Sequence, residues 1–194
     1  MKIAILGAGA MGCIYGARLS AIPDNQVVLV DVWKEHLEAI NRDGILLEEA
    51  GALTAYPHVR GTADPAEAGT ADLVVVFVKS TITEQAIQDN LALVGPDTAV
   101  LTLQNGLGNI DALKKHVPAG NILAGTTAHG GTMLGPGKVR HAGKGKTYIG
   151  ELSGQPKEKE SIIGMLRTLP ELRSRFGKVY VSFGEPLPLA DLLA

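Results

Sequence analysis

Short apolar runs alternate with amphipathic segments along the first 150 residues of the chain. The first run, Lys2 to Leu6, stops at Gly7 and is typical of a buried strand. Further strands are predicted at Val27–Val30, Leu73–Val78, Thr98–Leu103, Asn121–Thr127 and Lys138–His141. Helices are predicted at Ala10–Ala21, Lys34–Arg42, Asp64–Ala68, Thr83–Leu93 and Ile110–His116, and a β-hairpin at Ile45–Tyr56. This alternation predicts an α/β fold with a doubly wound parallel sheet.

The pattern changes after about Gly150. Gln155–Glu160 is polar and charged, Ser161–Thr168 is predicted to be helical, and Lys178–Phe183 is predicted to be a strand. We therefore predict a domain over residues 1–150 and a short α/β appendage of different origin over residues 151–194.

The turn after the first strand carries the firmest motif. Gly7-Ala8-Gly9-Ala10-Met11-Gly12 follows a strand and opens a helix, which is the context that a dinucleotide-binding Gly loop requires. Gly7 permits the tight turn, Gly9 lets the backbone approach a pyrophosphate, and Gly12 lets the helix pack close to the sheet. The helix N-terminus would offer N–H groups to the phosphates. The motif predicts a Rossmann-like domain; the alternative is a packing turn without a ligand.

Asp31 stands at the end of the second strand, about 20 residues after the Gly loop. A carboxylate at this place hydrogen-bonds the adenosine ribose and repels a 2′-phosphate, which favours NAD over NADP. Lys34, the nearest cation, could instead support NADP binding. The structural alternative for Asp31 is a solvated helix cap.

Two polar side chains follow later strands. Lys79 comes after the strand at Leu73–Val78, and Asn105 follows the next strand. Parallel sheets bind ligands at the carboxyl ends of their strands, so both residues are candidates for contact with cofactor or substrate. A solvated lysine and an Asn-Gly turn are the alternatives.

Composition narrows the function classes. The hydrophobic content of 45% is enough for a core, and the net charge of −2 gives no electrostatic support for a nucleic-acid or membrane-surface role. No apolar run is long enough to span a membrane, and we expect no metal site. Cys13, the single cysteine, is expected to be a packing residue in a reducing compartment, so we expect the cytoplasm.

Together the motifs resemble the N-terminal domain of the ketopantoate reductase (2-dehydropantoate 2-reductase) family. The matching segments are Met1–Gly12, Ala71–Leu73, Val78–Ser80, Leu103–Asn109, Gly125–Gly130, Gly135–Gly137 and His141–Gly143. The resemblance implies an oxidoreductase of pantothenate biosynthesis that transfers hydride from NAD(P)H to the keto carbon of 2-dehydropantoate. It also implies that Lys79 and Asn105 lie at the cofactor–substrate junction, with Asn105 on the substrate and Gly130 near the nicotinamide.

The sequence departs from this family in two ways. Members that use NADPH commonly carry an Arg just after the second strand, where this chain has Asp31-Val32-Trp33. The family also continues into an all-helical C-terminal domain with a catalytic Lys in a Trp-x-Lys-Leu setting. Trp33 is the only tryptophan here, so that motif is absent, and Lys79 becomes the one candidate for a catalytic role. We therefore expect a catalytically incomplete site.

The tail is similar to a late segment of bacterial glycerol-3-phosphate acyltransferase. The similarity covers Glu151–Gly154, Lys157–Glu160 and Phe176–Leu187, and the change falls near Thr147–Gly150. That family needs a His followed five positions later by Asp, and no His of this chain has an Asp at that offset.

Three functions stay open at this point. The first is a ketopantoate-reductase-type enzyme that acts on a small 2-keto acid. The second is a dinucleotide-binding module without turnover, and the third is an acyltransferase-derived protein. An apolar face is also expected where the helical domain would dock, which allows a homodimer through this face or its coverage by the tail.

Overall fold

The computed structural model describes residues 1–152 of the 194-residue chain. The helix predicted at Ser161–Thr168 and the strand predicted at Lys178–Phe183 lie outside the described residues. Within residues 1–152, no helix is both long and apolar enough to cross a membrane.

Seven strands form the main sheet in the order β11-β8-β7-β6-β1-β2-β5. Their bounds are β1 Lys2–Leu6, β2 Gln26–Val30, β5 Val59–Thr62, β6 Leu73–Val76, β7 Ala99–Thr102, β8 Ile122–Thr127 and β11 Thr147–Glu151. All neighbours are parallel except β11, which pairs antiparallel with β8. In the centre, Ile5 of β1 lies opposite Leu29 of β2 and Val75 of β6.

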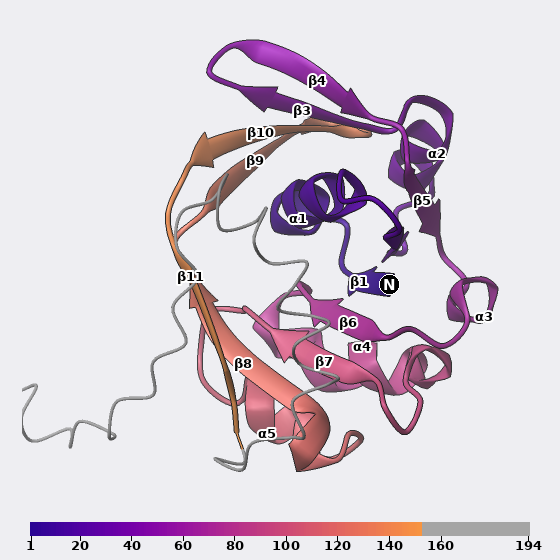
Figure 1. The fold of residues 1–194 in the computed structure, drawn as a ribbon, viewed down its shortest axis with the longest axis vertical. Helices are drawn as coiled ribbons and strands as arrows, with labels where there is room; N and C mark the ends of the chain where they lie inside the picture. The colour runs from indigo at the N-terminus through magenta and orange to yellow at the C-terminus, as the bar shows by residue number, and fades with distance from the viewer. Residues whose placement is uncertain (153–194) are drawn as a thin grey trace, which may run out of the picture.

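A second sheet has the order β4-β3-β10-β9. It consists of β3 Ile45–Glu49, β4 Ala52–Tyr56, β9 Gly130–Gly135 and β10 Lys138–Gly143. The sheet consists of two hairpins, β3–β4 and β9–β10, and parallel pairing between β3 and β10 joins them. The first helix, α1 (Ala10–Ser20), lies between this sheet and the main sheet (Figure 1).

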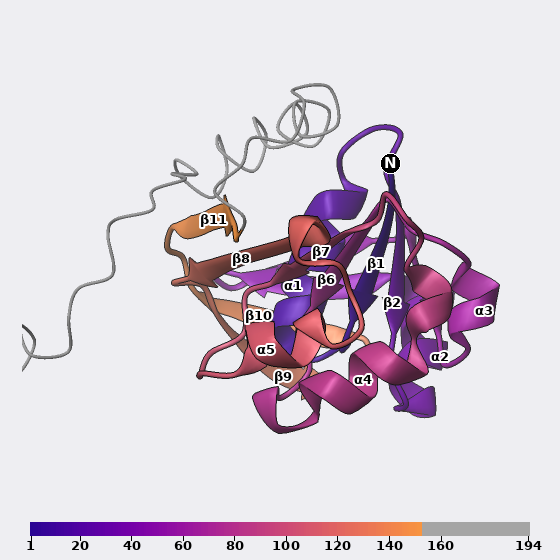
Figure 2. The same ribbon diagram turned by 90° about the horizontal axis from the view of Figure 1, so that it is seen from below.

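The remaining helices complete two layers on the main sheet. They are α2 Lys34–Asp43, α3 Pro65–Ala68, α4 Thr83–Asp89 and α5 Asn109–Lys114. Figure 2 shows α4 and α5 along the face of the sheet opposite α1. The strand residues divide accordingly: Ile3 and Ile5 pack toward α1 and the second sheet, whereas Ala4 and Leu6 belong to the cluster that contains Ile87 of α4. Both faces of β1 are therefore buried, which explains its unbroken apolar run.

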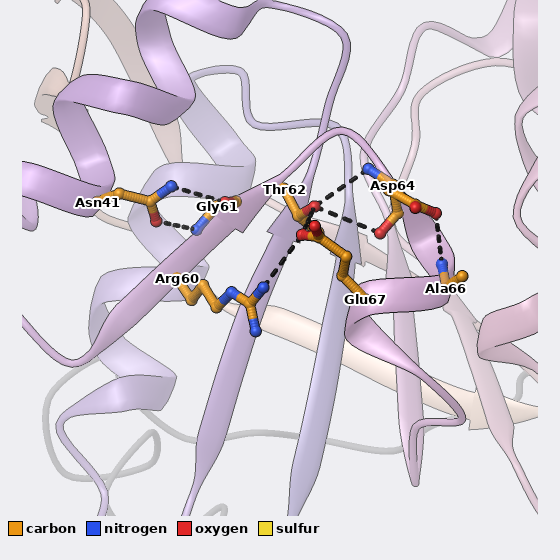
Figure 3. Close-up of polar contacts among 7 residues, drawn as sticks. All are labelled: Asn41, Arg60, Gly61, Thr62, Asp64, Ala66 and Glu67. Carbon is orange, nitrogen blue, oxygen red and sulfur yellow. Dashed lines mark hydrogen bonds and ion pairs between the residues drawn. The ribbon is translucent and has the colours of Figure 1, made fainter.

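The open edge of the main sheet at β5 is covered by a side chain. The Asn41 amide of α2 donates to the Gly61 carbonyl (2.8 Å) and accepts from the Gly61 N–H (2.7 Å), as a neighbouring strand would (Figure 3). Beyond the strand, the Asp64 carboxylate caps α3 by accepting from the Ala66 N–H. The two Asn41 bonds occupy backbone groups of Gly61 that an edge strand otherwise leaves unpaired.

The predicted elements of residues 1–150 are found, with several corrections. The strand predicted at Leu73–Val78 stops at Val76, since Phe77 and Val78 belong to the following loop. The helix predicted at Thr83–Leu93 stops at Asp89, and a 3-10 helix follows at Leu91–Leu93. The strands β5, β9 and β11 were not predicted.

Candidate functional site

Four loops meet at one edge of the main sheet. Because β1, β2, β6 and β7 are parallel, the residues that follow them emerge side by side. These residues are Gly7, Asp31, Phe77 and Leu103. The sequence prediction that the Gly loop, Asp31, Lys79 and Asn105 share one edge is therefore matched by the topology.

The three glycines of the loop differ in their surroundings. Gly7 has a φ of +96°, and a Cβ there would lie 2.9 Å from the Phe77 carbonyl carbon. A Cβ on Gly12 would lie 1.9 Å from the Gly7 carbonyl oxygen, so only glycine lets α1 approach β1 this closely. Gly9, the N-cap of α1, has no atom within 4 Å of the position of a Cβ. The fold requires Gly7 and Gly12, but nothing in the described chain requires Gly9.

Asp31 is bonded to the loop. Its Oδ2 accepts from the Ala8 N–H at 2.6 Å, and its Oδ1 accepts from the Trp33 N–H at 3.0 Å. Val32 and Trp33 beside it are exposed apolar residues, at 90% and 43% of their surface. Asp31 thus fixes the backbone of the Gly loop at Ala8, and the two residues that follow it are exposed and apolar.

His36 of α2 also contacts the Gly loop, at the carbonyl of Ala8. It is fully buried, its Nε2 lies 2.8 Å from the Ala8 carbonyl oxygen, and its Nδ1 accepts from the Gly137 N–H at 2.9 Å. Burial lowers the pKa of His36, and the hydrogen bond to Ala8 and the charge of Asp31 oppose this effect only in part. His36 is therefore neutral at pH 7.

Cys13 lies against this histidine, with its Sγ 3.4 Å from His36 Nε2 and 3.1 Å from the Ala8 carbonyl oxygen. Burial, and to a lesser extent the charge of Asp31, raises the pKa of the thiol to about 12. A thiol that stays protonated is a poor nucleophile, which agrees with the packing role expected for Cys13.

An open pocket of about 490 Å³ adjoins the Gly loop. Met11, Lys79 and Asn105 of the predicted site line it, and Lys79 and Asn105 are exposed. The other lining residues are Phe77, Val78, Ser80, Thr81, Leu103, Gln104, Thr127 and His129. The pocket combines an apolar floor with polar groups from three loops, which is typical of small-ligand sites.

A buried polar network fixes the two loops that carry Lys79 and Asn105. The Gln104 amide donates to the Val78 carbonyl (2.6 Å) and to the Thr83 hydroxyl (2.9 Å). Asn109 donates to the carbonyl of Asn105 at 3.2 Å and accepts from the Thr83 hydroxyl at 2.9 Å. The loop backbones are held while the side chains of Lys79 and Asn105 stay exposed.

The far wall of the pocket is backed by two side-chain clusters. The hydroxyls of Tyr15, Thr127 and Thr147 lie within 2.6–3.1 Å of one another. Next to them, His129 Nδ1 lies 3.0 Å from His141 Nε2. These contacts join α1 and the second sheet to the pocket wall at β8.

On its other side, the buried His141 contacts the half-buried carboxylate of Glu49. Its Nδ1 lies 2.6 Å from Glu49 Oε1, and Arg18 forms an ion pair with the other oxygen of Glu49. Burial acts to raise the pKa of Glu49, but the bonds from Arg18 and His141 outweigh it and lower that pKa to about 2. Glu49 therefore stays ionised and anchors the cluster.

Sequence reasoning found part of this site. The pocket brings Met11, Lys79 and Asn105 together, and the Asp31–Ala8 bond joins the ribose candidate to the loop. Gly130 does not line the pocket, although it follows His129, which does. His36, Gln104, Thr127 and His129 were missed. All but His36 had a signal, because they lie inside segments that carry the family resemblance.

Two family models match the sequence of this chain. The family model described as ketopantoate reductase PanE/ApbA matches residues 3–154. The chain belongs to the ketopantoate reductase family. A second model, the glycerol-3-phosphate acyltransferase C-terminal region, matches residues 148–194. Both resemblances seen in the sequence are confirmed, and the predicted change near Gly150 falls where the two matches overlap.

Curated relatives carry the same name. The chain is 40% identical to 2-dehydropantoate 2-reductase from Halobacterium salinarum over 154 residues, which are 79% of this chain and 50% of that enzyme. It is 35% identical to the enzyme of the same name from Streptococcus pyogenes serotype M1 over 75% of this chain and 46% of the enzyme. The chain thus spans about half the length of the curated relatives it matches.

Solved structures agree on the fold. A ternary structure of D-mandelate dehydrogenase with NADH and anilino(oxo)acetate superposes with a TM-score of 0.80 at 33% identity, over 94% of this chain and 57% of that one. The 2-dehydropantoate 2-reductase from Geobacter metallireducens GS-15 gives 0.77 at 33% identity, over 88% of this chain and 56% of that one. The predicted Rossmann-like α/β class is therefore confirmed.

Proposed function

We propose that this chain binds a nicotinamide dinucleotide at the Gly loop and that it prefers NADH to NADPH. The observation that carries the proposal is Gly9. It caps a helix of 11 residues, it is exposed, and no atom approaches the position of its Cβ. A glycine without a folding role at a helix N-terminus suits the close approach of a pyrophosphate.

The preference for NADH rests on Asp31. It directly follows β2, and an acidic residue at that strand end hydrogen-bonds the ribose in dinucleotide-binding folds of this kind. The negative charge of a 2′-phosphate would be repelled there. The D-mandelate dehydrogenase that superposes on this chain was solved with NADH. The opposing feature is Lys34, which is exposed at the start of α2 and could attract a 2′-phosphate.

For the chemistry, we propose a site of the 2-dehydropantoate 2-reductase type, suited to reduction of a small 2-keto acid but catalytically incomplete in this chain. A reduced nicotinamide would supply a hydride when bound. Hydride addition to a carbonyl carbon leaves an alkoxide, which needs a proton from a positioned acid. Lys79 is the candidate, because among the described residues that line the pocket it is the one lysine or arginine. Asn105 could hold the substrate through its amide.

A dinucleotide-binding module without turnover is the second candidate. The observation that favours it is the sequence itself, in which the Trp-x-Lys-Leu setting of the family's catalytic lysine is absent. We therefore expect nucleotide binding with little or no reduction of 2-dehydropantoate by these 194 residues. The unit over residues 1–150, the appendage over residues 151–194, a homodimer and a cytoplasmic location stay predictions.

Two measurements test the proposal. Separate titrations with NADH and NADPH should show binding below millimolar concentration, with NADH tighter. A turnover assay with 2-dehydropantoate should then show little or no oxidation of the bound nucleotide. The binding proposal fails if neither nucleotide binds, and robust turnover would rule out the module without catalysis.

Asp31→Ala tests the ribose contact. The change also removes the acceptor of the Ala8 N–H, so we expect both nucleotides to bind more weakly. NADH should lose about tenfold or more and NADPH less, because repulsion of the 2′-phosphate disappears at the same time. Asp97→Ala, in an exposed turn, is the matched control. Equal losses for the two nucleotides would remove Asp31 from the ribose site.

A further inference from the structure

We propose that His36 is a positioning residue for the Gly loop: it holds the Ala8 carbonyl and thereby couples nucleotide binding to the second sheet. This inference rests on the proposed function, since it concerns the shape in which the loop receives a nucleotide. It adds a residue that lies outside the Gly motif.

The Ala8 peptide groups are held from two sides. The Ala8 N–H donates to Asp31 Oδ2 at 2.6 Å, and the Ala8 carbonyl oxygen lies 2.8 Å from His36 Nε2. Ala8 sits between Gly7 and Gly9, which have no side chains to restrict the backbone. Because glycine loses the most conformational freedom on ordering, bonds that fix the loop beforehand reduce the cost of binding.

The hydrogen bonds of His36 define its tautomer. The Gly137 N–H lies 2.9 Å from Nδ1 and can only donate, so Nδ1 carries no proton. The ring proton is therefore on Nε2, which donates to the Ala8 carbonyl. A second proton on Nδ1 would point at the Gly137 N–H and break the bond, so only the neutral ring fits both partners.

Gly137 ties this arrangement to the second sheet. It lies in the turn between β9 and β10, and its carbonyl accepts from the Leu46 N–H of β3 at 2.8 Å. A Cβ on Gly137 would lie 3.1 Å from the Ala39 Cβ, and its φ is +69°. The turn is therefore pressed against α2, and the position of His36 depends on the second sheet as well as on its own helix.

The following groups surround the His36 imidazole. Asp31 acts on it from the end of β2, and the Cys13 thiol lies against it from α1. Trp33 stacks on the imidazole, with ring centroids 4.8 Å apart and 14° between the planes. Lys34 and Glu35 of its own helix are exposed, and the β9–β10 turn contributes the Gly137 backbone.

Trp33 supplies a direct reporter, because it is the only tryptophan of the chain. Its fluorescence should change when the stacked imidazole gains a proton. We expect NADH affinity to be constant above pH 7 and to fall about tenfold once His36 is protonated, with the same midpoint as the Trp33 signal. Since burial lowers the pKa of His36, this midpoint should lie below 6.5.

Two variants separate positioning from packing. His36→Gln keeps an N–H donor for the Ala8 carbonyl and cannot titrate, so it should bind NADH within about threefold of wild type and lose most of the pH dependence. His36→Phe keeps a ring against Trp33 but removes the donor, so it should bind about tenfold more weakly at pH 7. His58→Gln, at an exposed histidine, is the control.

Hydrogen exchange of residues 7–12 without nucleotide gives a readout that does not depend on binding. At pH 7 the loop should exchange faster in His36→Phe than in wild type or His36→Gln. Equal exchange in all three, or unchanged pH dependence of NADH affinity in His36→Gln, overturns the inference. If wild type binds no nucleotide, the proposed function fails while hydrogen exchange still decides the role of His36. If His36→Phe does not fold, the pH profile of His36→Gln decides it.

Discussion

Two glycine substitutions in the same loop should differ in their effect on stability: Gly9→Ala should leave it nearly unchanged, and Gly12→Ala should lower it. Gly9→Ala places a methyl group where no atom lies within 4 Å, on a backbone with φ −66° that alanine adopts without strain. Gly12→Ala places it 1.9 Å from the Gly7 carbonyl oxygen. The first change meets only the space that a pyrophosphate would enter, whereas the second pushes α1 away from β1.

The magnitudes follow from these contacts. For Gly12→Ala the contact must open by about 1 Å or more, at an overpacking cost of about 3 kcal/mol. The higher helix propensity of alanine stabilises the folded state by about 1 kcal/mol, so the net loss in the free energy of unfolding is about 2 kcal/mol. For a chain of this size that corresponds to a fall in Tm of about 4–8 °C. For Gly9→Ala the poorer cap and the stiffer unfolded chain offset each other to within about 0.5 kcal/mol.

Thermal melts and NADH titrations of both variants measure the contrast. Gly9→Ala should keep the wild-type Tm within about 2 °C and lose NADH affinity by at least about tenfold, which is about 1.4 kcal/mol. Gly12→Ala should lose both. If Gly9→Ala binds NADH as wild type does, the loop does not receive a pyrophosphate. If Gly12→Ala melts as wild type does, the close approach of α1 to β1 is not a constraint on the fold.

Two further predictions concern ionisable side chains that are wholly or partly buried. Burial lowers the pKa values of His36 and His129, so the unfolded chain binds more protons below pH 6.5 and stability should fall as the pH drops from 7 to 5; an unchanged Tm over this range would contradict it. Glu49→Gln breaks a largely buried ion cluster and should cost about 2 kcal/mol, whereas Glu84→Gln, in an exposed pair, should cost less than about 0.5 kcal/mol. Chemical unfolding measures both variants, and equal losses would refute the role of burial.

The sequence predicts the main sheet well because its central strands are buried on both faces. Uninterrupted runs such as Lys2–Leu6 have few other interpretations once a glycine turn follows them. It does not predict β9, whose Gly130-Gly131 start has low strand propensity. That strand exists because β10 pairs with it on one side and α1 packs against it, with the position of a Gly131 Cβ only 2.5 Å from Ile14. Tertiary contacts override local preference there.

The candidate site likewise contains residues that the sequence predicts and residues that it does not. Gly7, Gly12, Asp31, Lys79 and Asn105 follow from rules about strand ends, because parallel strands bring those ends together. The residues that hold them cannot be found by such rules. His36 is 28 positions from Ala8 and Gly137 is 101 positions from His36, so their bonds exist only once both sheets have formed.

The glycines of the loop therefore differ in role: two are required by the fold, and one is not. Gly7 and Gly12 are required by contacts with Phe77 and with the loop itself, so a foldable chain would keep them without any ligand. No contact within the described residues requires Gly9, whereas Asp31 and His36 both hydrogen-bond the neighbouring residue Ala8. A flexible residue flanked by bonds that hold it in place is expected where a ligand must reach the backbone. This combination supports the proposed nucleotide binding more strongly than the glycine spacing alone.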